Sequence, residues 1–267
     1  MERVSTARIL RPNGLTSSPR SIWCDVRHFP KRWPALPGGR HEVVLHSPVH
    51  DAAFPTLGAE QAAKVVELWS ARTAALGARD DVAYVFVFEN RGRQIGSTID
   101  HPHSQIMAFD SIPPIAEAEL SAAKCGLCEE DPDDGLLVVR RSGWQAAVPW
   151  APAWPYQLLI SPHAHVPDLP TAGRELRAGL GAMLVDVLTR VERLLGSDAP
   201  YMLWIHQRPA TREDDDWPAA HLHLHLAPAM RARNVRRHFA AAEYGAGIFF
   251  DPIDPLQAAA QLRAQLT

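Results

Sequence analysis

The stretch that decides the fold is Asp100-His101-Pro102-His103-Ser104-Gln105-Ile106, which follows the apolar run Val82–Phe88. The apolar run is rich in β-branched and aromatic residues and predicts a strand. If the second stretch is also extended, His101, His103 and Gln105 share one face, because side chains alternate along a strand. An imidazole beside an amide suits attack on an anionic phosphoryl group. The same pattern also fits a half-buried strand with incidental histidines.

Composition and charge set the class of protein. The chain has 267 residues, 46% hydrophobic and 21% charged, which is typical of a globular protein with a substantial core. A net charge of -3 argues against nucleic-acid binding, although Arg231–Arg237 holds a basic cluster. We find neither an apolar run of membrane-span length nor the apolar core of a signal peptide. The expectation is a cytoplasmic protein without nucleic-acid or membrane partners.

Two half-length units show the same order of signals: a strand, Ser-Pro and a histidine, a long helix, a second strand and a His-x-His pair. The first unit has Ser47–His50, a helix over about 60–78, the strand 84–88 and the stretch quoted above. The second has Ser161–His165, a helix over about 172–195, the strand 201–206 and finally His221–His225. Both helices place apolar residues at three- and four-residue spacing.

The repeat predicts an α+β protein of two pseudo-symmetric modules, each an antiparallel sheet packed with a long helix. Ser111–Pro114 breaks the chain between them and precedes a short helix over about 115–124. We therefore expect an N-terminal module over 1–115 and a C-terminal module over 118–267.

Five motifs together make the chain resemble the galactose-1-phosphate uridylyltransferase family, the transferase branch of the histidine-triad superfamily. They are Arg8-Ile9-Leu10-Arg11-Pro12, Ser47-Pro48-Val49-His50, Phe88-Glu89-Asn90, His101-Pro102-His103-Ser104-Gln105 and Pro149-Trp150-Ala151 with Trp154-Pro155-Tyr156. The C-terminal segment 242–248 and the run 256–266 are also similar to the family's ending.

The resemblance implies histidine-triad-like modules and a ping-pong nucleotidyl transfer between a nucleotide sugar and a sugar phosphate. His103 would attack the α-phosphorus and hold the nucleotide, and Gln105 would hydrogen-bond the transferred phosphoryl group. The neutral amide of Gln105 has no acid role, which favours transfer over hydrolysis. The resemblance also implies a homodimer and six substrate-binding residues: Arg8, Arg11, Glu89, Asn90, Gly96 and Thr98.

The cysteines indicate a metal. Cys125-Gly126-Leu127-Cys128 lies in a chain with only three cysteines and no secretion signal, so a metal site is favoured over a disulfide. The resemblance implies a structural zinc ion bound by Cys125, Cys128, His165 and His221, a closed tetrahedral set. An unpaired surface Cys-x-x-Cys is the alternative.

The first module departs from this pattern. It keeps His50 and His101, but the loop that would hold a Cys-x-x-Cys pair is missing, and Cys24 falls in an expected strand over 23–28. We therefore expect no four-ligand zinc site there. A second departure is Lys31, where the family commonly has Asn near the nucleotide.

Several functions stay open at this point. UDP-glucose and galactose 1-phosphate are the default substrates. The alternatives are phosphorolysis of ADP-glucose or a dinucleoside polyphosphate, hydrolysis at the histidine triplet His221–His225, and a nucleotide-binding pseudoenzyme. The sugar, the base and the pathway are not defined by the residues.

Overall fold

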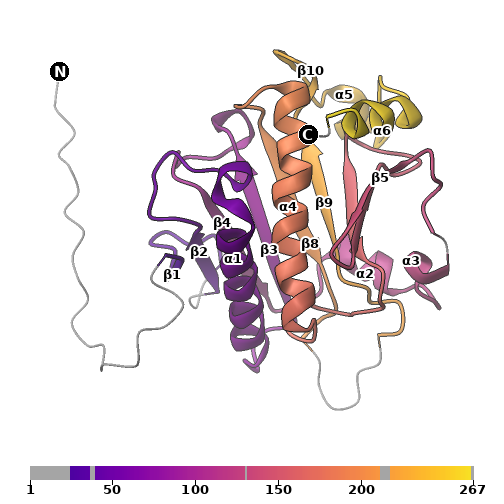
Figure 1. Ribbon diagram of the computed structural model, residues 1–267. Coiled ribbons are helices and arrows are strands. Elements are labelled where there is room, and N and C mark those ends of the chain that lie inside the picture. Colours follow the sequence, from indigo (N-terminus) through magenta and orange to yellow (C-terminus); the bar gives the residue numbers. More distant parts are fainter. Residues whose placement is uncertain (1–24, 37–39, 130, 211–216, 266–267) are drawn as a thin grey trace, which may run out of the picture.

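The structure, a computed structural model, describes residues 25–36, 40–129, 131–210 and 217–265. Its centre is a nine-stranded sheet in the order β1-β2-β4-β3-β8-β9-β7-β6-β5, with antiparallel pairing throughout (Figure 1). The strands are β1 Arg27–Pro30, β2 His41–Leu45, β3 Tyr84–Arg91, β4 His103–Phe109, β5 Leu137–Arg141, β6 Trp144–Ala147, β7 Leu158–Pro162, β8 Tyr201–His206 and β9 His223–Pro228. A separate pair is formed by β10 Met230–Ala232 and β11 Val235–Arg236.

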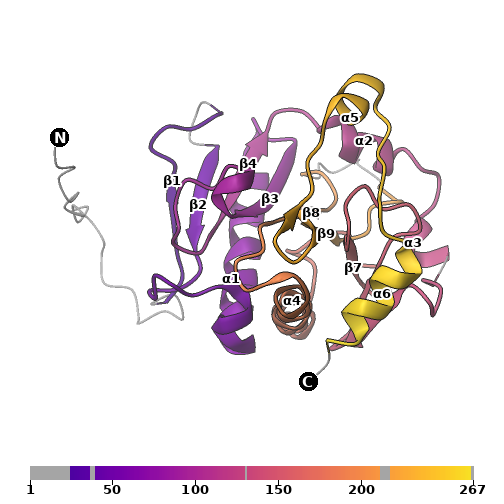
Figure 2. The ribbon, with the colours of Figure 1, turned by 90° about the horizontal axis from the view of Figure 1, so that it is seen from above.

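Two long helices, α1 and α4, lie side by side across one face of this sheet (Figures 1 and 2). The helices are α1 Phe54–Gly77, α2 Pro114–Leu120, α3 Gly126–Glu129, α4 Arg174–Leu195, α5 Ala241–Ala246 and α6 Pro255–Arg263, with a 3-10 turn η2 over Arg93–Ile95. The expected α+β class, with a long helix in each half, is therefore confirmed. In the described part of the chain, no helix is long and apolar enough to cross a membrane.

The sheet shows the repeat as a mirrored strand order. The sequence β1-β2-β4-β3 in the first half matches β6-β7-β9-β8 in the second, and the halves join where β3 pairs with β8, for example Phe88 with Trp204. One sheet therefore runs through both halves, which the sequence did not indicate. The module limits 1–115 and 118–267 stay a prediction.

Strand alternation assigns one face of the sheet to the core. Val87 and Ile205 pair across the central junction and are buried, and they face the helix residues Trp69 and Leu184. The two helices meet at Gly181, where an added Cβ would lie 2.6 Å from the Ala63 backbone nitrogen. Only glycine permits that approach, so this position fixes how closely the halves pack.

The opposite face of the sheet is the one that carries the site. Ser104 points towards the helices, because its Oγ accepts a hydrogen bond from Trp69 Nε1 at 2.7 Å. Its neighbours His103 and Gln105 therefore point to the other face. β4 lies between β2 and β3, so these side chains are flanked by strands on both sides.

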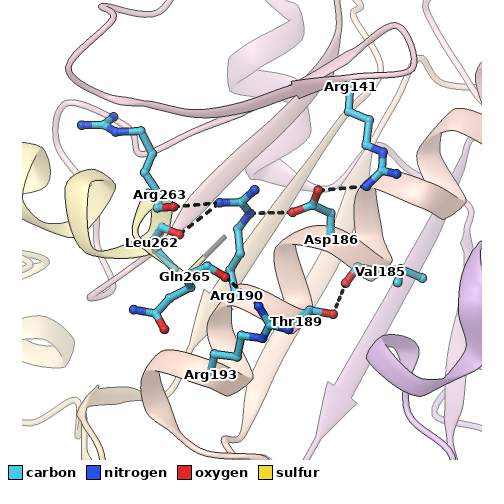
Figure 3. Close-up of polar contacts among 9 residues, drawn as sticks. All are labelled: Arg141, Val185, Asp186, Thr189, Arg190, Arg193, Leu262, Arg263 and Gln265. Atoms are coloured by element: carbon cyan, nitrogen blue, oxygen red, sulfur yellow. Dashed lines mark hydrogen bonds and ion pairs between the residues drawn. The ribbon is translucent and has the colours of Figure 1, made fainter. Parts of the chain in front are cut away.

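The C-terminal helix α6 is held against α4 by arginines (Figure 3). The Arg190 guanidinium donates to the carbonyls of Leu262 at 3.2 Å and Arg263 at 3.3 Å, and to Asp186 Oδ1 at 2.5 Å. Arg193 Nη1 donates to the Gln265 carbonyl at 3.1 Å. These contacts satisfy carbonyls at the helix end that have no partner within the helix.

Candidate functional site

His103 begins β4 and presents one ring nitrogen for chemistry. Its Nδ1 lies 2.8 Å from the His101 carbonyl oxygen. Because a carbonyl only accepts, Nδ1 carries the proton and Nε2 keeps its lone pair. Burial is the largest effect on the His103 pKa and lowers it, the bond to the His101 carbonyl opposes this, and the charges of His101 and Lys31 lower it further. The ring is therefore a neutral nucleophile at physiological pH.

A cavity of about 320 Å³ opens beside His103. Its walls come from the end of β3, the loop after it and the residues before β4; the lining includes Glu89, Asn90, Arg91, Gly92, Arg93, Ser97, Asp100 and His101. Gly92 has φ +107, and a Cβ there would lie 2.8 Å from Pro200. An ion pair of 2.5 Å between Arg93 and Asp100 spans the loop. The contact of Gly92 with Pro200 and the Arg93–Asp100 ion pair therefore fix the path of the loop along the cavity.

The predicted substrate-binding residues fall into three groups in the structure. Asn90 and Glu89 line the cavity, whereas Gly96 and Thr98 belong to its loop but not to its lining. Gly96 has φ +94 and ends the turn η2, so it shapes the loop. Arg8 and Arg11 lie outside the described residues.

Glu89 is a buried carboxyl at the cavity wall. It lies within β3, just beyond the strand 84–88 that the sequence predicts, and its Oε1 accepts a hydrogen bond from the Tyr201 hydroxyl at 2.9 Å. Burial raises the Glu89 pKa to about 7, although the bond to Tyr201 and the charge of Arg91 lower it. The raised pKa favours the neutral form more than in an ordinary Glu, which makes this carboxyl a poor fixed anion beside a phosphate.

Gln105 lies two residues beyond His103 on the same face of β4, and its amide oxygen is fully engaged. Its Oε1 lies 2.9 Å from Lys31 Nζ and 2.9 Å from His41 Nε2. His41 opens β2, and the sequence analysis did not place it at the site. The sequence offers only that His41 precedes His50 by nine residues. That spacing points to Gln105 only once β2 and β4 are known to pair.

The four predicted zinc ligands come together in the second half of the chain. Cys125, Cys128, His165 and His221 each offer an atom within 4.8 Å of the others. His221 Nδ1 lies 3.2 Å from Cys125 Sγ, and His165 Nδ1 lies 3.2 Å from Cys128 Sγ. His221 Nε2 donates to the Pro162 carbonyl at 3.1 Å, a bond that orients the ring as in known metal sites.

The corresponding pair in the first half is His50 and His101. Their Nδ1 atoms lie 3.2 Å apart, and His101 Nε2 lies 2.8 Å from the Ser47 carbonyl oxygen. No third Cys, His, Asp or Glu completes a metal group around them among the residues whose structure is described. Cys24 lies outside those residues.

The structure brings together a second group of potential metal ligands that the sequence did not indicate. Glu119, His206, His223 and His225 each offer an atom within 4.8 Å of the others. Glu119 Oε2 lies 2.7 Å from His206 Nδ1 and 3.5 Å from His223 Nε2. Both ring nitrogens of His225 are buried without a hydrogen-bond partner. Glu119 comes from α2 and the histidines from β8 and β9, and the pairing of these two strands sets His206 opposite His223.

This group separates His223 from its repeat-related counterpart His103. His223 Nδ1 also bonds the carbonyl two residues earlier, that of His221, at 2.7 Å. Its Nε2, however, faces the carboxylate of Glu119 and not the cavity beside His103. Within the histidine triplet, His221 thus lies beside the thiolates, whereas His223 lies beside Glu119.

The same family emerges from comparison with known proteins. The chain matches the family model for the galactose-1-phosphate uridyl transferase N-terminal domain over residues 31–113 and that for the C-terminal domain over residues 100–251. A galactose-1-phosphate uridylyltransferase of Thermotoga maritima is 33% identical over 232 residues, which cover 83% of this chain and 73% of that protein. The chain belongs to the galactose-1-phosphate uridylyltransferase family. The resemblance drawn from the motifs is thereby confirmed, and with it the assignment as an enzyme.

Two further relatives bear on fold and function. A solved uridylyltransferase structure superposes with a TM-score of 0.84 at 25% identity, covering 97% of this chain and 94% of that one. An ADP-glucose phosphorylase of Arabidopsis thaliana is 25% identical over 233 residues, covering 84% of this chain and 64% of that protein. Proteins similar to this chain therefore include one named as a uridylyltransferase and one named as a phosphorylase.

Proposed function

We propose that the protein moves a nucleoside monophosphate from a nucleotide sugar to a hexose 1-phosphate through a covalent nucleotidyl-His103. UDP-glucose and galactose 1-phosphate are the default pair, and the names of two relatives include galactose 1-phosphate and the uridylyl group. The observation that carries the proposal is the free Nε2 of a neutral His103 at the cavity, with Nδ1 held by a carbonyl.

The reaction has two displacement steps. His103 Nε2 forms a bond to the α-phosphorus, and the bond from that phosphorus to the bridging oxygen breaks, releasing the sugar 1-phosphate. A second sugar 1-phosphate then attacks the same phosphorus, and the N–P bond breaks to restore His103. While the nucleotide is bound, the ring is positively charged, and the Nδ1–H bond to the His101 carbonyl stabilises that charge.

The remaining predicted residues bind substrate in this proposal. Asn90 and the backbone of the loop 92–98 contact phosphate oxygens, with Gly96 and Thr98 shaping the loop. Glu89, whose carboxyl bonds Tyr201, supports the cavity wall. Arg8 and Arg11 reach the phosphates.

The enzyme is also a homodimer in this proposal. Exposed side chains near the C-terminus, those of Tyr244, Phe249 and Phe250, supply apolar surface for the contact between subunits.

A direct test is mass analysis of the intact protein after incubation with UDP-glucose and no acceptor. One uridylyl group per chain is the expected gain, lost again on addition of galactose 1-phosphate. Binding of UDP-glucose without a mass gain would favour the pseudoenzyme.

Phosphorolysis is the second candidate, supported by the Arabidopsis phosphorylase relative. The first step is shared, and only the acceptor differs. Adding inorganic phosphate or galactose 1-phosphate separately to the isolated adduct distinguishes the two, because only the true acceptor discharges the adduct rapidly.

Zinc is the proposed metal of the group Cys125, Cys128, His165 and His221. Two thiolates and two imidazoles fit a closed zinc site, which has no open position for substrate and is structural. Bound there, zinc joins the α3 turn to β9 and the loop after β7.

We propose that Glu119, His206, His223 and His225 hold a second metal ion. The set of three imidazoles and one carboxylate suits a divalent transition metal. Metal analysis should give one equivalent that Cys125→Ser removes and another that His225→Ala removes. A single equivalent of metal that is lost in both variants would contradict two independent sites.

A further inference from the structure

The amide of Gln105 is held by two donors that meet at one oxygen. Lys31 Nζ and His41 Nε2 both lie 2.9 Å from Gln105 Oε1. The three residues come from the end of β1, the start of β2 and the middle of β4, which are neighbouring strands. The contacts therefore cross the sheet on the face that carries His103.

The protonation of His41 follows from its second nitrogen. The backbone N–H of Ala35 donates to His41 Nδ1 at 3.2 Å, so Nδ1 is the acceptor. The proton of the neutral ring is then on Nε2, which donates to Gln105. Burial is the largest effect on the His41 pKa and lowers it, against the bond to Gln105, and the charge of Lys31 lowers it further.

Lys31 settles which amide atom faces the two donors. An ammonium group only donates, so the atom it contacts is the oxygen of Gln105 and not the nitrogen. Both lone pairs of that oxygen are then used, by Lys31 and by His41. The amide nitrogen, with two N–H groups, points away from them.

The position of Lys31 is itself fixed by the sheet. Its backbone N–H donates to the His41 carbonyl at 2.8 Å, which continues the pairing of Pro30 with Glu42. The Lys31 side chain thus leaves β1 directly beside β2 and reaches across it to β4. The described residues provide no hydrogen bond to the Gln105 Nε2 group, which remains available to a ligand.

We infer that Lys31 and His41 are positioning residues that lock Gln105 with its N–H groups towards the phosphoryl group transferred to His103. This inference rests on the proposed function. If the amide were reversed, its oxygen would face the anionic phosphoryl oxygens and repel them. The lock therefore keeps two donors aimed at the charge that develops during attack, with no reorganisation at that moment.

The test measures the single-turnover rate of nucleotidyl-His103 formation from UDP-glucose, by intact mass, in a double-mutant cycle. Lys31→Met and His41→Phe should each slow the maximal rate about tenfold. Gln105→Leu removes the donor outright and should slow it about 10²-fold or more. The UDP-glucose concentration for half-maximal rate should not change. In the Gln105→Leu background, Lys31→Met should have no further effect.

Two controls separate the lock from simpler roles. Arg32→Met removes an adjacent positive charge that makes no contact with Gln105 and should keep the wild-type rate. Gln105→Glu keeps acceptors for Lys31 and His41 but has no N–H, so it should be as slow as Gln105→Leu. Thermal unfolding midpoints confirm that each variant is folded.

Distinct results overturn distinct statements. Equal losses from Lys31→Met with and without Gln105, or a changed half-maximal concentration at an unchanged maximal rate, would show that Lys31 binds the phosphate itself and overturn the lock alone. A wild-type rate in Gln105→Glu would do the same. Absence of any adduct in the wild-type protein would overturn the proposed function and this inference with it.

Discussion

Glu42 is a buried carboxylate whose removal should destabilise the fold by a predictable, pH-dependent amount. It is 4% exposed, and both of its oxygens accept hydrogen bonds from Arg72 of α1, at 2.7 and 2.8 Å. His28 Nδ1 lies 3.4 Å away. Burial alone would raise the Glu42 pKa, but the bonds from His28 and Arg72 outweigh it and lower the pKa from 4.5 to about 2.

The lowered pKa of Glu42 corresponds to a contribution to the free energy of unfolding. A lowering from 4.5 to about 2 corresponds to roughly 3 kcal/mol, within the range of about 3–5 kcal/mol for breaking a buried pair. Because the folded-state pKa is the lower one, the contribution is complete above the unfolded pKa. It is lost as the pH falls from about 4.5 to about 2.

Urea denaturation of the wild type and Glu42→Gln provides the measurement. We expect a difference of roughly 3 kcal/mol at pH 7 that falls to roughly 1 kcal/mol at pH 3. Comparing the two proteins cancels the acid response of the other carboxylates and of metal ligands. The control is Asp81→Asn, which removes the exposed partner of Arg79 and should change little. A difference below about 1 kcal/mol at pH 7, or one independent of pH, would refute this account of Glu42.

The remaining predictions concern packing, metal and chemistry. Gly181→Ala places a Cβ 2.6 Å from Ala63 and should destabilise the protein by about 1–3 kcal/mol in urea, whereas Gly245→Ala, in the helix α5 with open space around it, should not; equal effects would contradict the close helix contact. Cys125→Ser should lose one equivalent of zinc on metal analysis and lower the thermal midpoint, and an unchanged zinc content would remove Cys125 from the site. Gln105→His should slow transfer and let water discharge the adduct, seen as UMP release without acceptor; unchanged transfer would show that no donor amide is needed there.

Local patterns in the sequence were sufficient for the long helices and for the site's main residues. The helix α4 was expected over 172–195 and lies at Arg174–Leu195, because its apolar spacing is regular. The helix α1 begins at Phe54, earlier than expected, and includes Gly58 with φ +74, where two helical segments meet without a periodic signal. His103 and Gln105 share a face as expected, since strand alternation requires no knowledge of neighbours.

Contacts between distant segments were beyond the sequence. The metal group around Glu119 joins residues 87 positions apart, and it depends on the pairing of β8 with β9 and on α2 lying beside them. His41 meets Gln105 across 64 residues because β2 pairs with β4. Glu89 lies beyond the predicted strand 84–88, but pairing with Leu203 of β8 extends β3 to include it.

The measurement that tests the central claim most directly is adduct formation with UDP-glucose in His103→Asn and His223→Asn, compared by intact mass. The account predicts no uridylyl gain for His103→Asn with UDP-glucose binding largely retained, because the side chain is the nucleophile and not the anchor. It predicts that His223→Asn still gains one uridylyl group. A uridylyl gain in His103→Asn and none in His223→Asn would place the nucleophile in the C-terminal half and contradict the account.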